Sequence, residues 1–537
     1  MSSESTQLDD KIEEVKTDRA INPLKVTLIA LTLGLAVEIL FFGHPWGVNF
    51  FLWAALCVGA LLFASIVEDV DAQRMELLLI LPIIGFAFVT FLRLEPLTVF
   101  LGVVFTLILF TLWVRTFRSD DLLRFGWIDY AVAVIWVPLE SWLRPWPTIG
   151  AAGREAVGER GAGSRVIPIL RGALLAFPIL VVLIALLAAA DLIFADYVEE
   201  ALKWLDLEVL AEYFGRLLLI LFSATFFLGA LITALRDPGE RTLIGEEKPI
   251  LGPFIGFVET VIVLGAVDLI FLLFVIIQLT YLFGGEANIT ASGYTYAEYA
   301  QRGFGELVAV AFLCLGLIMV LGNWGKRSEP RQTHWFNGLS GLLVGLLGVV
   351  LASGMMRLIL YEGAYGFTRL RTYTHVFIIW LGILLVAFLV VLFTNRLRKF
   401  ALVTVLAILG FGASLSLLNV DAFIVEQNTK RLAATGDIDI EYLTSLSNDA
   451  VLNLVELVEL SPEDVREELL PQLACTRYEL ETRRNNVSWP SFHISHNRAY
   501  QLLEGMKALD AYSIYAEDWY MVADGPTGET YCNSWGW

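Results

Sequence analysis

The sequence predicts an all-α polytopic membrane protein with about 11 transmembrane helices and a small, mainly helical C-terminal domain. Of the 537 residues, 57% are hydrophobic and only 17% are charged, whereas a soluble protein carries roughly a quarter charged residues. The mean hydropathy is +0.67. Apolar residues gather in runs such as "FIIWLGILLVAFLVVLF", and about 18 apolar residues suffice to cross about 30 Å of hydrocarbon as a helix.

The chain divides into five predicted segments. Residues 1–24 are polar and mixed in charge, which predicts a disordered cytoplasmic tail without a cleavable signal peptide. Residues 25–115 hold a first transmembrane block of about four helices, and 169–420 hold a second of about seven. Between them, 116–168 is predicted to be a cytoplasmic or interfacial segment with a linker. Beyond residue 420 the long apolar runs stop, so 421–537 is predicted to be a soluble acidic domain.

The individual spans follow from the positions of the apolar runs. Each run is long enough for a membrane helix and is separated from the next by a short polar stretch. The expected spans are 25–42, 48–67, 75–92, 96–114, 170–194, 212–234, 252–283, 305–324, 337–360, 374–394 and 399–419.

Residues 125–143, "FGWIDYAVAVIWVPLESWL", are apolar but are interrupted by Asp129, Pro138 and Glu140. Basic residues flank this segment on both sides, so it is expected to lie in the interface or to be re-entrant. The alternative, in which it spans, gives about 12 helices and leaves about eight basic residues on the wrong side. The Gly, Pro and Arg content of 145–168 predicts a flexible linker.

The basic residues of the short loops predict the topology. The connections "LRDPGERTLIGEEKP", "GNWGKRSEPRQ" and "NRLRKF" carry an excess of Lys and Arg, which favours the cytoplasmic side. This places the N-terminus in the cytoplasm and the C-terminal domain outside.

The C-terminal domain is acidic. Residues 421–537 hold 20 Asp and Glu against 8 Lys and Arg, about −12 of the net charge of −19, which argues against nucleic-acid binding. Three amphipathic stretches predict helices, and the last segment, "YSIYAEDWYMVADGPTGETYCNSWGW", alternates as a hairpin does. Cys475 and Cys532 are the only cysteines in this domain and are a candidate disulfide, although sequence cannot show their proximity.

Several motifs give the chain a family resemblance. "FVIIQLTYLFGG" (274–285), followed by "GYTYAEYAQRGFGEL" (293–307), resembles the signature of bacterial multi-pass membrane proteins known as domain of unknown function 4173. "AAADLIFADYV", "MRLILYEGAYGFTRLRTYT", "NVDAFIVEQN" and "IDIEYLTSLSNDAV" extend the likeness over roughly residues 165–455. The resemblance implies a multi-pass protein of the bacterial plasma (inner) membrane, and it supplies no catalytic or cofactor-binding residue.

Ionisable residues inside the spans are candidate site residues, because a charge at the bilayer centre costs several kcal/mol. Asp268 is the deepest and could bind a cation, relay protons, pair with a base or form a structural hydrogen bond. Glu259 lies nine residues earlier, on the opposite face of the same helix. An outward-facing polar pocket is expected near the outer ends of other spans. The pocket residues are Glu306, Arg357, Tyr361, Glu362 and Arg371.

The remaining motifs do not predict catalysis. "GLSG" (338–341) resembles an intramembrane protease motif, but His375 begins the next span about 30 Å away, and a nucleophile and its base need about 3 Å. His493 and His496 have metal-ligand spacing without a clear third ligand, and Ser495 between them reads more simply as a helix cap. No catalytic, cofactor-binding or metal-binding residue is therefore predicted, and an enzymatic role is not favoured.

Three function classes stay open. The polar residues within and at the ends of the spans favour a transporter or channel-like permease. The acidic outer domain favours a membrane sensor or scaffold that binds a protein partner through residues 421–537. The third class is an intramembrane enzyme acting on a lipid-linked substrate. The bilayer is the one partner common to all three.

Overall fold

In the computed structural model, the chain splits into two compact units, which are described in turn. Unit 1 comprises Met1–Ile84, Leu107–Leu122 and Ala131–Glu240, and unit 2 comprises Gly85–Thr106, Leu123–Tyr130 and Arg241–Trp537. The residues that the structure describes are 21–157, 172, 176, 179–180, 182–184, 186–204, 207–236, 243, 252–282, 304–517, 520–526 and 528–533. The predicted tail up to residue 20, and 293–303 of the motif at 293–307, lie outside them.

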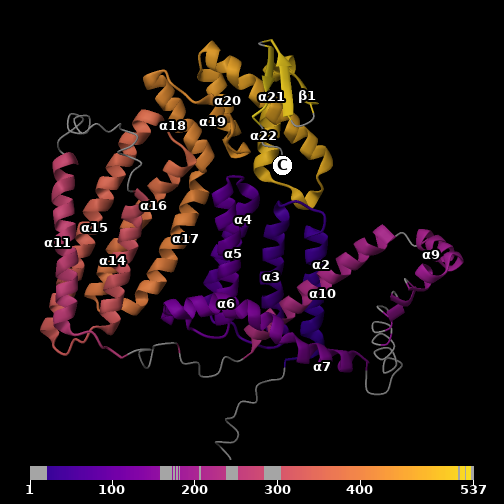
Figure 1. Cartoon of the computed structure of the whole chain (residues 1–537), viewed down its shortest axis with the longest axis horizontal. Coiled ribbons are helices and arrows are strands. Elements are labelled where there is room, and N and C mark those ends of the chain that lie inside the picture. Colours follow the sequence, from indigo (N-terminus) through magenta and orange to yellow (C-terminus); the bar gives the residue numbers. More distant parts are fainter. Residues whose placement is uncertain are drawn as a thin grey trace, which may run out of the picture. The chain divides into compact units, whose positions relative to one another are not determined.

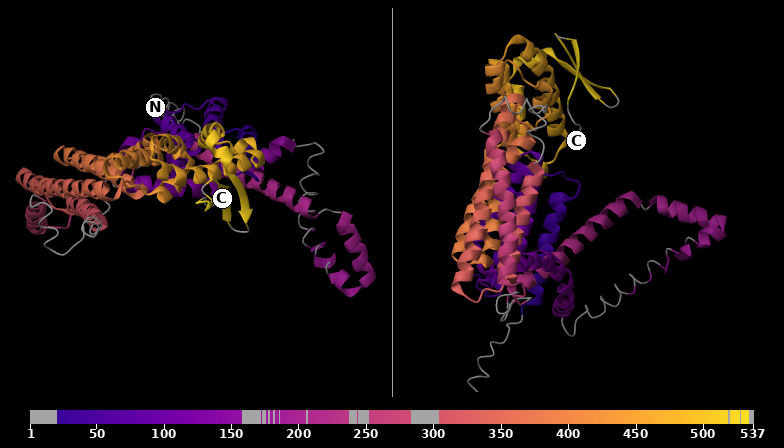
Figure 2. Two further views of the ribbon diagram at one scale, coloured as in Figure 1. Left: turned by 90° about the horizontal axis from the view of Figure 1, so that it is seen from above. Right: turned by 60° about the vertical axis from the view of Figure 1, so that its left-hand side comes forward.

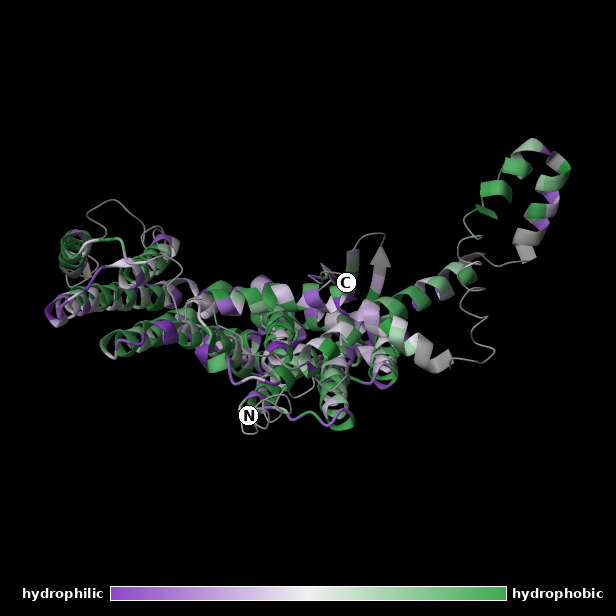
Figure 3. Ribbon diagram, turned by 90° about the horizontal axis from the view of Figure 1, so that it is seen from below, coloured by the Kyte–Doolittle hydropathy of each residue, from purple (hydrophilic) through white to green (hydrophobic). Residues whose placement is uncertain are grey.

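The prediction of an all-α polytopic membrane protein is confirmed. Within the described residues, nine helices are long and apolar enough to cross a membrane. Figure 3 shows hydrophobic residues along these helices and hydrophilic ones at their ends and connections. Of the other two expected spans, 75–92 forms the shorter apolar helix Glu76–Leu92. The other is 170–194, and most of its first part, 170–185, lies outside the described residues. The nine are Pro23–Phe41, Val48–Val67, Pro96–Thr116, Val209–Leu235, Phe257–Gln278, Gly305–Trp324, Pro330–Tyr365, Arg369–Phe393 and Leu397–Leu418.

Unit 1 is built around α2 (Pro23–Phe41), α3 (Val48–Val67) and α10 (Leu207–Leu235). The backbones of α2 and α10 approach closely, because a Cβ on Gly34 would lie 2.5 Å from the Ile220 carbonyl oxygen. α10 thus groups with the first helices of the chain, whereas the predicted blocks assigned it to the second. The unit also holds α9 (Leu192–Trp204), the 3₁₀ turn η1 (Glu76–Leu79) and parts of α4 (Ile80–Leu92) and α5 (Pro96–Thr116).

Two further helices occupy the predicted interfacial segment at 125–143 and the first half of the predicted linker at 145–168. α6 (Trp127–Leu143) is a 17-residue helix with Pro138 inside it. From Ala131 onward it runs across the direction of α2 and α3 (Figure 1). Residues 145–157 form α7 (Pro145–Val157), so this half of the predicted flexible linker is helical; proline is well tolerated in the first turn of a helix. Residues 158–168 lie outside the described residues.

The membrane part of unit 2 is a row of long helices standing side by side (Figures 1 and 2). Its core consists of leucine, isoleucine and phenylalanine side chains from several helices, including Leu264, Ile318, Leu343 and Phe388. The helices are α11 (Phe257–Leu282), α14 (Phe304–Trp324), α15 (Pro330–Tyr365), α16 (Arg369–Phe393) and α17 (Phe400–Leu418).

The C-terminal domain begins directly after α17 and lies at one end of this row (Figure 2). Only Asn419, in the left-handed conformation at φ 52°, separates α17 from α18. Leu415 of α17 belongs to the same buried cluster as Leu454 and Leu473 of the domain, so the two share one core. The helices are α18 (Val420–Thr435), α19 (Ile440–Thr444), α20 (Val451–Leu460), α21 (Glu463–Asn486) and α22 (Ile494–Glu504), with short 3₁₀ turns between them.

A three-stranded antiparallel sheet ends the described chain. Its strands are β1 (Ser513–Glu517), β2 (Tyr520–Gly525) and β3 (Gly528–Tyr531), in the order β1-β2-β3. The expected hairpin is thus present with one further strand. Gln472 of α21 donates to the Tyr531 carbonyl at 2.7 Å, and a disulfide joins Cys475 to Cys532.

Candidate functional site

Polar side chains gather in unit 2 where the membrane helices meet the C-terminal domain. We call this set the polar junction. Its members come from the turn Arg93–Glu95 between α4 and α5, from the first residue of α16, and from the domain itself. The polar junction consists of Arg93, Glu95, Arg369, Asp421 and Asp449.

A buried ion pair lies at the centre of the polar junction. The Arg369 guanidinium donates Nε to Asp421 Oδ1 at 2.8 Å and Nη2 to Oδ2 at 2.7 Å. Asp421 is 0% exposed and also accepts the Ser447 backbone N–H at 2.9 Å. Arg369 begins α16, and Asp421 lies in the first turn of α18, where the helix dipole favours a carboxylate. The paired geometry is the strong, orientation-specific form of an arginine–carboxylate contact.

Two carboxylates organise the α4–α5 turn. Asp449 accepts the backbone N–H groups of Leu94 at 2.6 Å and Glu95 at 3.1 Å. Glu95 in turn accepts the N–H of Thr98 at 2.8 Å, which satisfies an amide in the first turn of α5, and it bonds the Tyr373 hydroxyl. Burial raises the pKa of the Asp449 carboxyl above its ordinary value. The domain therefore caps a turn between two apolar helices with its own side chain.

Two histidines of the domain, the buried His493 and the half-buried His496, lie close together, and His493 contacts the same turn. His493 Nε2 lies 3.2 Å from the Arg93 carbonyl oxygen, and His493 Nδ1 accepts the Ser495 N–H at 3.2 Å. The proton of the neutral ring therefore sits on Nε2. His496 Nδ1 is 2.9 Å from the Asn448 amide. Burial lowers the pKa of His493 to about 4 and that of His496 to about 3.

This burial makes the C-terminal domain sensitive to acid. Both histidines have an ordinary pKa of 6.5, so the unfolded chain takes up protons below that pH before the folded domain does. Stability is thus fully present above about pH 6.5 and falls as the pH drops toward 4, by up to about 1.4 kcal/mol per histidine for each pH unit. Urea unfolding of the domain between pH 6.5 and 5 measures this slope.

The control for this pH dependence must take account of the charged groups near the two histidine rings. Arg483 opposes their protonation, and the raised pKa of the Asp449 carboxyl acts in the opposite direction on stability, so the control compares two proteins that both keep Asp449. The variant His496→Gln should roughly halve the pH slope, because one of two titrating groups is removed. A slope equal to that of the unchanged protein would contradict the assignment.

The structure brings together three of the predicted pocket residues. The Arg371 guanidinium lies 4.1 Å above the ring of Tyr361, and Arg371 donates to the Tyr365 carbonyl at 3.0 Å. Glu362 is 3% exposed and lies 3.0 Å from His375 Nδ1. Sequence reasoning considered His375 only as a partner for a serine and missed this contact, which spans 13 residues across the α15–α16 turn.

The other predicted residues lie apart from that group. Glu306 is exposed in the first turn of α14. Glu259 is exposed and bonds the Gly256 N–H at the start of α11. Arg357 is half-buried on α15. Asp268 is 5% exposed, and its two carboxylate oxygens have no hydrogen-bond partner among the residues that the structure describes.

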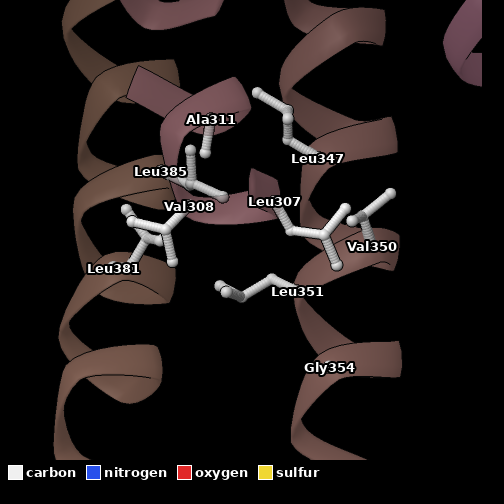
Figure 4. Close-up of a pocket in the computed structure, with 9 residues that line it drawn as sticks. All are labelled: Leu307, Val308, Ala311, Leu347, Val350, Leu351, Gly354, Leu381 and Leu385. Atoms are coloured by element: carbon white, nitrogen blue, oxygen red, sulfur yellow. The ribbon is translucent and has the colours of Figure 1, made fainter. Parts of the chain in front are cut away.

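A cavity of about 20 Å³ lies between α14, α15 and α16 (Figure 4). Its walls are apolar side chains and one glycine, so it offers no group that would bind a polar substrate. The lining residues are Leu307, Val308, Ala311, Leu347, Val350, Leu351, Gly354, Leu381 and Leu385.

The polar junction is not visible from sequence patterns alone. Asp421 and Asp449 lie within "NVDAFIVEQN" and "IDIEYLTSLSNDAV", two motifs that carried the family resemblance, and this was the available signal. Arg93 and Glu95 stand out only as the charges of the short turn between two apolar runs.

Comparison with known proteins identifies the family. No curated protein and no solved structure gives a significant match. The model of the family described as a domain of unknown function (DUF4153) matches residues 80–457, which include every member of the polar junction. The resemblance to domain of unknown function 4173 was therefore wrong in its family, although it was right that the function of the family is unknown. The chain belongs to the DUF4153 family.

Proposed function

We propose that this protein is a membrane sensor or scaffold, whose C-terminal domain binds a protein partner and passes the bound state to the membrane helices. The observation that carries the proposal is the ion pair between Arg369 and Asp421, which joins the first residue of a span to a fully buried carboxylate of the domain. A domain tethered by a flexible linker would need no such contact.

Two observations support an extracytoplasmic location for the domain. The basic loops at the opposite ends of the helices favour the cytoplasm. The disulfide between Cys475 and Cys532 belongs to an oxidising compartment, since cytoplasmic thiols are kept reduced. In this orientation the domain receives its partner outside the cell, and the helices relay the event inward.

Hydrogen exchange tests the coupling between domain and membrane helices. An antibody fragment raised against the C-terminal domain serves as the bound partner of the full-length protein. Binding is expected to slow exchange of the Phe367 and Glu95 amides, which donate to Asn428 and Asp449 of the domain. In Asp421→Asn the effect at Phe367 should be lost while the fragment still binds.

The matched control is Asp437→Asn. Asp437 also pairs with an arginine, at 2.8 Å, but its side chain is 74% exposed. This variant should respond to the fragment as the unchanged protein does. If the bound fragment leaves both turn amides unaffected in the unchanged protein, the domain is a passive attachment and the proposal fails.

A second function, proton-coupled transport, is favoured by one observation. Asp268 is a buried carboxyl near the middle of α11, and no described residue donates to it or accepts from it. Such a group is held most cheaply in its protonated form within a membrane, because an isolated charge there costs several kcal/mol. A proton-coupled transporter would use the reversible protonation of the Asp268 carboxyl.

Carbodiimide labelling tests this second function. Dicyclohexylcarbodiimide adds to protonated carboxyl groups in apolar surroundings, and mass spectrometry locates the adduct. Labelling of the reconstituted protein is expected at Asp268, should decline as the pH rises, and should vanish in Asp268→Asn. The exposed Glu259 and Glu306 are internal controls. Equal labelling at the controls, or proton flux that persists in Asp268→Asn, would count against the transporter.

A further inference from the structure

The loop 487–492, between α21 and α22, exposes two large aromatic side chains. Trp489 is 62% exposed and Phe492 is 46% exposed, although Pro490 and Ser491 between them are buried. The buried Pro490 and Ser491 anchor the loop to the domain, so the two aromatic rings on either side of them point away from it. Exposure of this size at neighbouring positions calls for a contact outside the described chain.

The charge around this loop is the reverse of that in the rest of the domain. Residues 482–503 contain no Asp or Glu, yet they hold three of the eight basic residues of 421–537. These are Arg483, Arg484 and Arg498. A domain with about −12 net charge therefore carries one basic, aromatic stretch, and this stretch contains the loop.

The loop is held at the level where the membrane helices end. His493, the residue after the loop, contacts the carbonyl of Arg93, which directly follows the apolar helix α4. Figure 1 shows α22 on the side of the domain that faces the end of α4. Trp489 is four residues from His493, so the Cα atoms of the two residues lie within about 14 Å of each other. The interfacial layer of a bilayer is roughly 5 to 7 Å deep on each side.

We propose that the loop 487–492 contacts the membrane surface, with its two exposed rings in the interfacial layer and the arginines of 482–503 beside anionic lipid headgroups. Tryptophan is enriched in that layer, and arginine pairs well with phosphate. An anionic headgroup is the occupant that the charge favours, because this stretch is basic while the rest of the domain is acidic and would be repelled by a negative surface. This inference does not depend on the partner-binding proposal.

Fluorescence quenching in nanodiscs tests the contact. Trp489→Cys, in a full-length background with the buried Cys57 and Cys314 replaced by alanine, carries an environment-sensitive dye. Lipids with a nitroxide near the headgroup should remove most of its fluorescence in discs containing phosphatidylglycerol. The matched control is Tyr520→Cys, at a 45% exposed aromatic of β2, which should keep its fluorescence.

The arginines are tested in the same discs. Replacing Arg483, Arg484 and Arg498 with glutamine should reduce the quenching to the level found in discs of phosphatidylcholine alone, whereas Lys430→Gln should change nothing. Equal thermal unfolding of all variants shows that they fold. Absence of quenching at position 489 in both lipids overturns the proposal. A second outcome also contradicts the proposal. If a membrane-impermeant maleimide fails to label this cysteine in native membranes but labels it in nanodiscs, a protein partner covers the loop.

Discussion

Asp421→Ala is expected to lower the free energy of unfolding of the C-terminal domain by about 3 kcal/mol. The substitution leaves the Arg369 guanidinium without its paired acceptor and the Ser447 amide without its carboxylate. Breaking a buried pair from one side costs about 3 to 5 kcal/mol, and the 28% exposure of the Arg369 side chain lets water recover part of that. Pulse proteolysis in urea on the detergent-solubilised protein measures the loss.

Asp437→Ala is the control for this prediction. Its carboxylate bonds Arg431 at 2.8 Å, a distance close to that of the buried pair, yet its side chain is 74% exposed. Arg431 keeps its bonds to the carbonyl oxygens of Ala364 and Asp437, and water replaces the exposed carboxylate, so the loss should stay below about 1 kcal/mol. Equal losses in the two variants would show that burial of Asp421 is not what makes its pair important.

Loss of the disulfide is expected to destabilise the sheet end of the domain by about 4 kcal/mol, because the bond closes a long loop in the unfolded chain. Cys475 and Cys532 are 57 residues apart, and the loop holds α22 and all three strands. Cys475→Ser combined with Cys532→Ser should therefore give faster proteolysis within residues 487–533. In this variant the hydrogen bonds of Gln472 with Tyr531 and Asn533 still hold part of the sheet against α21.

A reducing agent provides the internal control for the disulfide. Reductant should bring the unchanged protein to the proteolysis rate of the double serine variant and leave the variant itself unaffected. If reductant accelerates both proteins equally, the effect lies elsewhere in the chain. If it accelerates neither, the bond contributes nothing to stability.

The membrane class could be predicted from the sequence because its cause is local. A run of apolar residues long enough to cross hydrocarbon is visible without knowing what it packs against, and nine such helices occur within the described chain. The prediction of a flexible linker at 145–157 was wrong, because composition alone does not show whether a proline lies at the first position of a helix or inside a loop. Gly, Pro and Arg suggested a flexible linker, but a proline at the first helical position is compatible with α7.

The polar junction could not be predicted, because its contacts join residues far apart in the chain. Asp449 bonds the Glu95 amide across 354 residues, and Arg369 meets Asp421 across 52. Each of these residues alone resembles an ordinary charge at the end of a helix. For Tyr361, Glu362 and Arg371 the sequence was more informative, since one short turn between two spans already holds them within a few helical turns of one another.

The capping of the α4–α5 turn by Asp449 has a consequence for biosynthesis. A ribosome adding roughly 5 to 20 residues per second needs roughly 20 to 70 s to travel from Glu95 to Asp449. During that interval the Leu94 and Glu95 amides lack the carboxylate that they bond in the finished protein. A chain that terminates early never acquires it. This capping contact therefore forms only in chains that have been extended as far as Asp449.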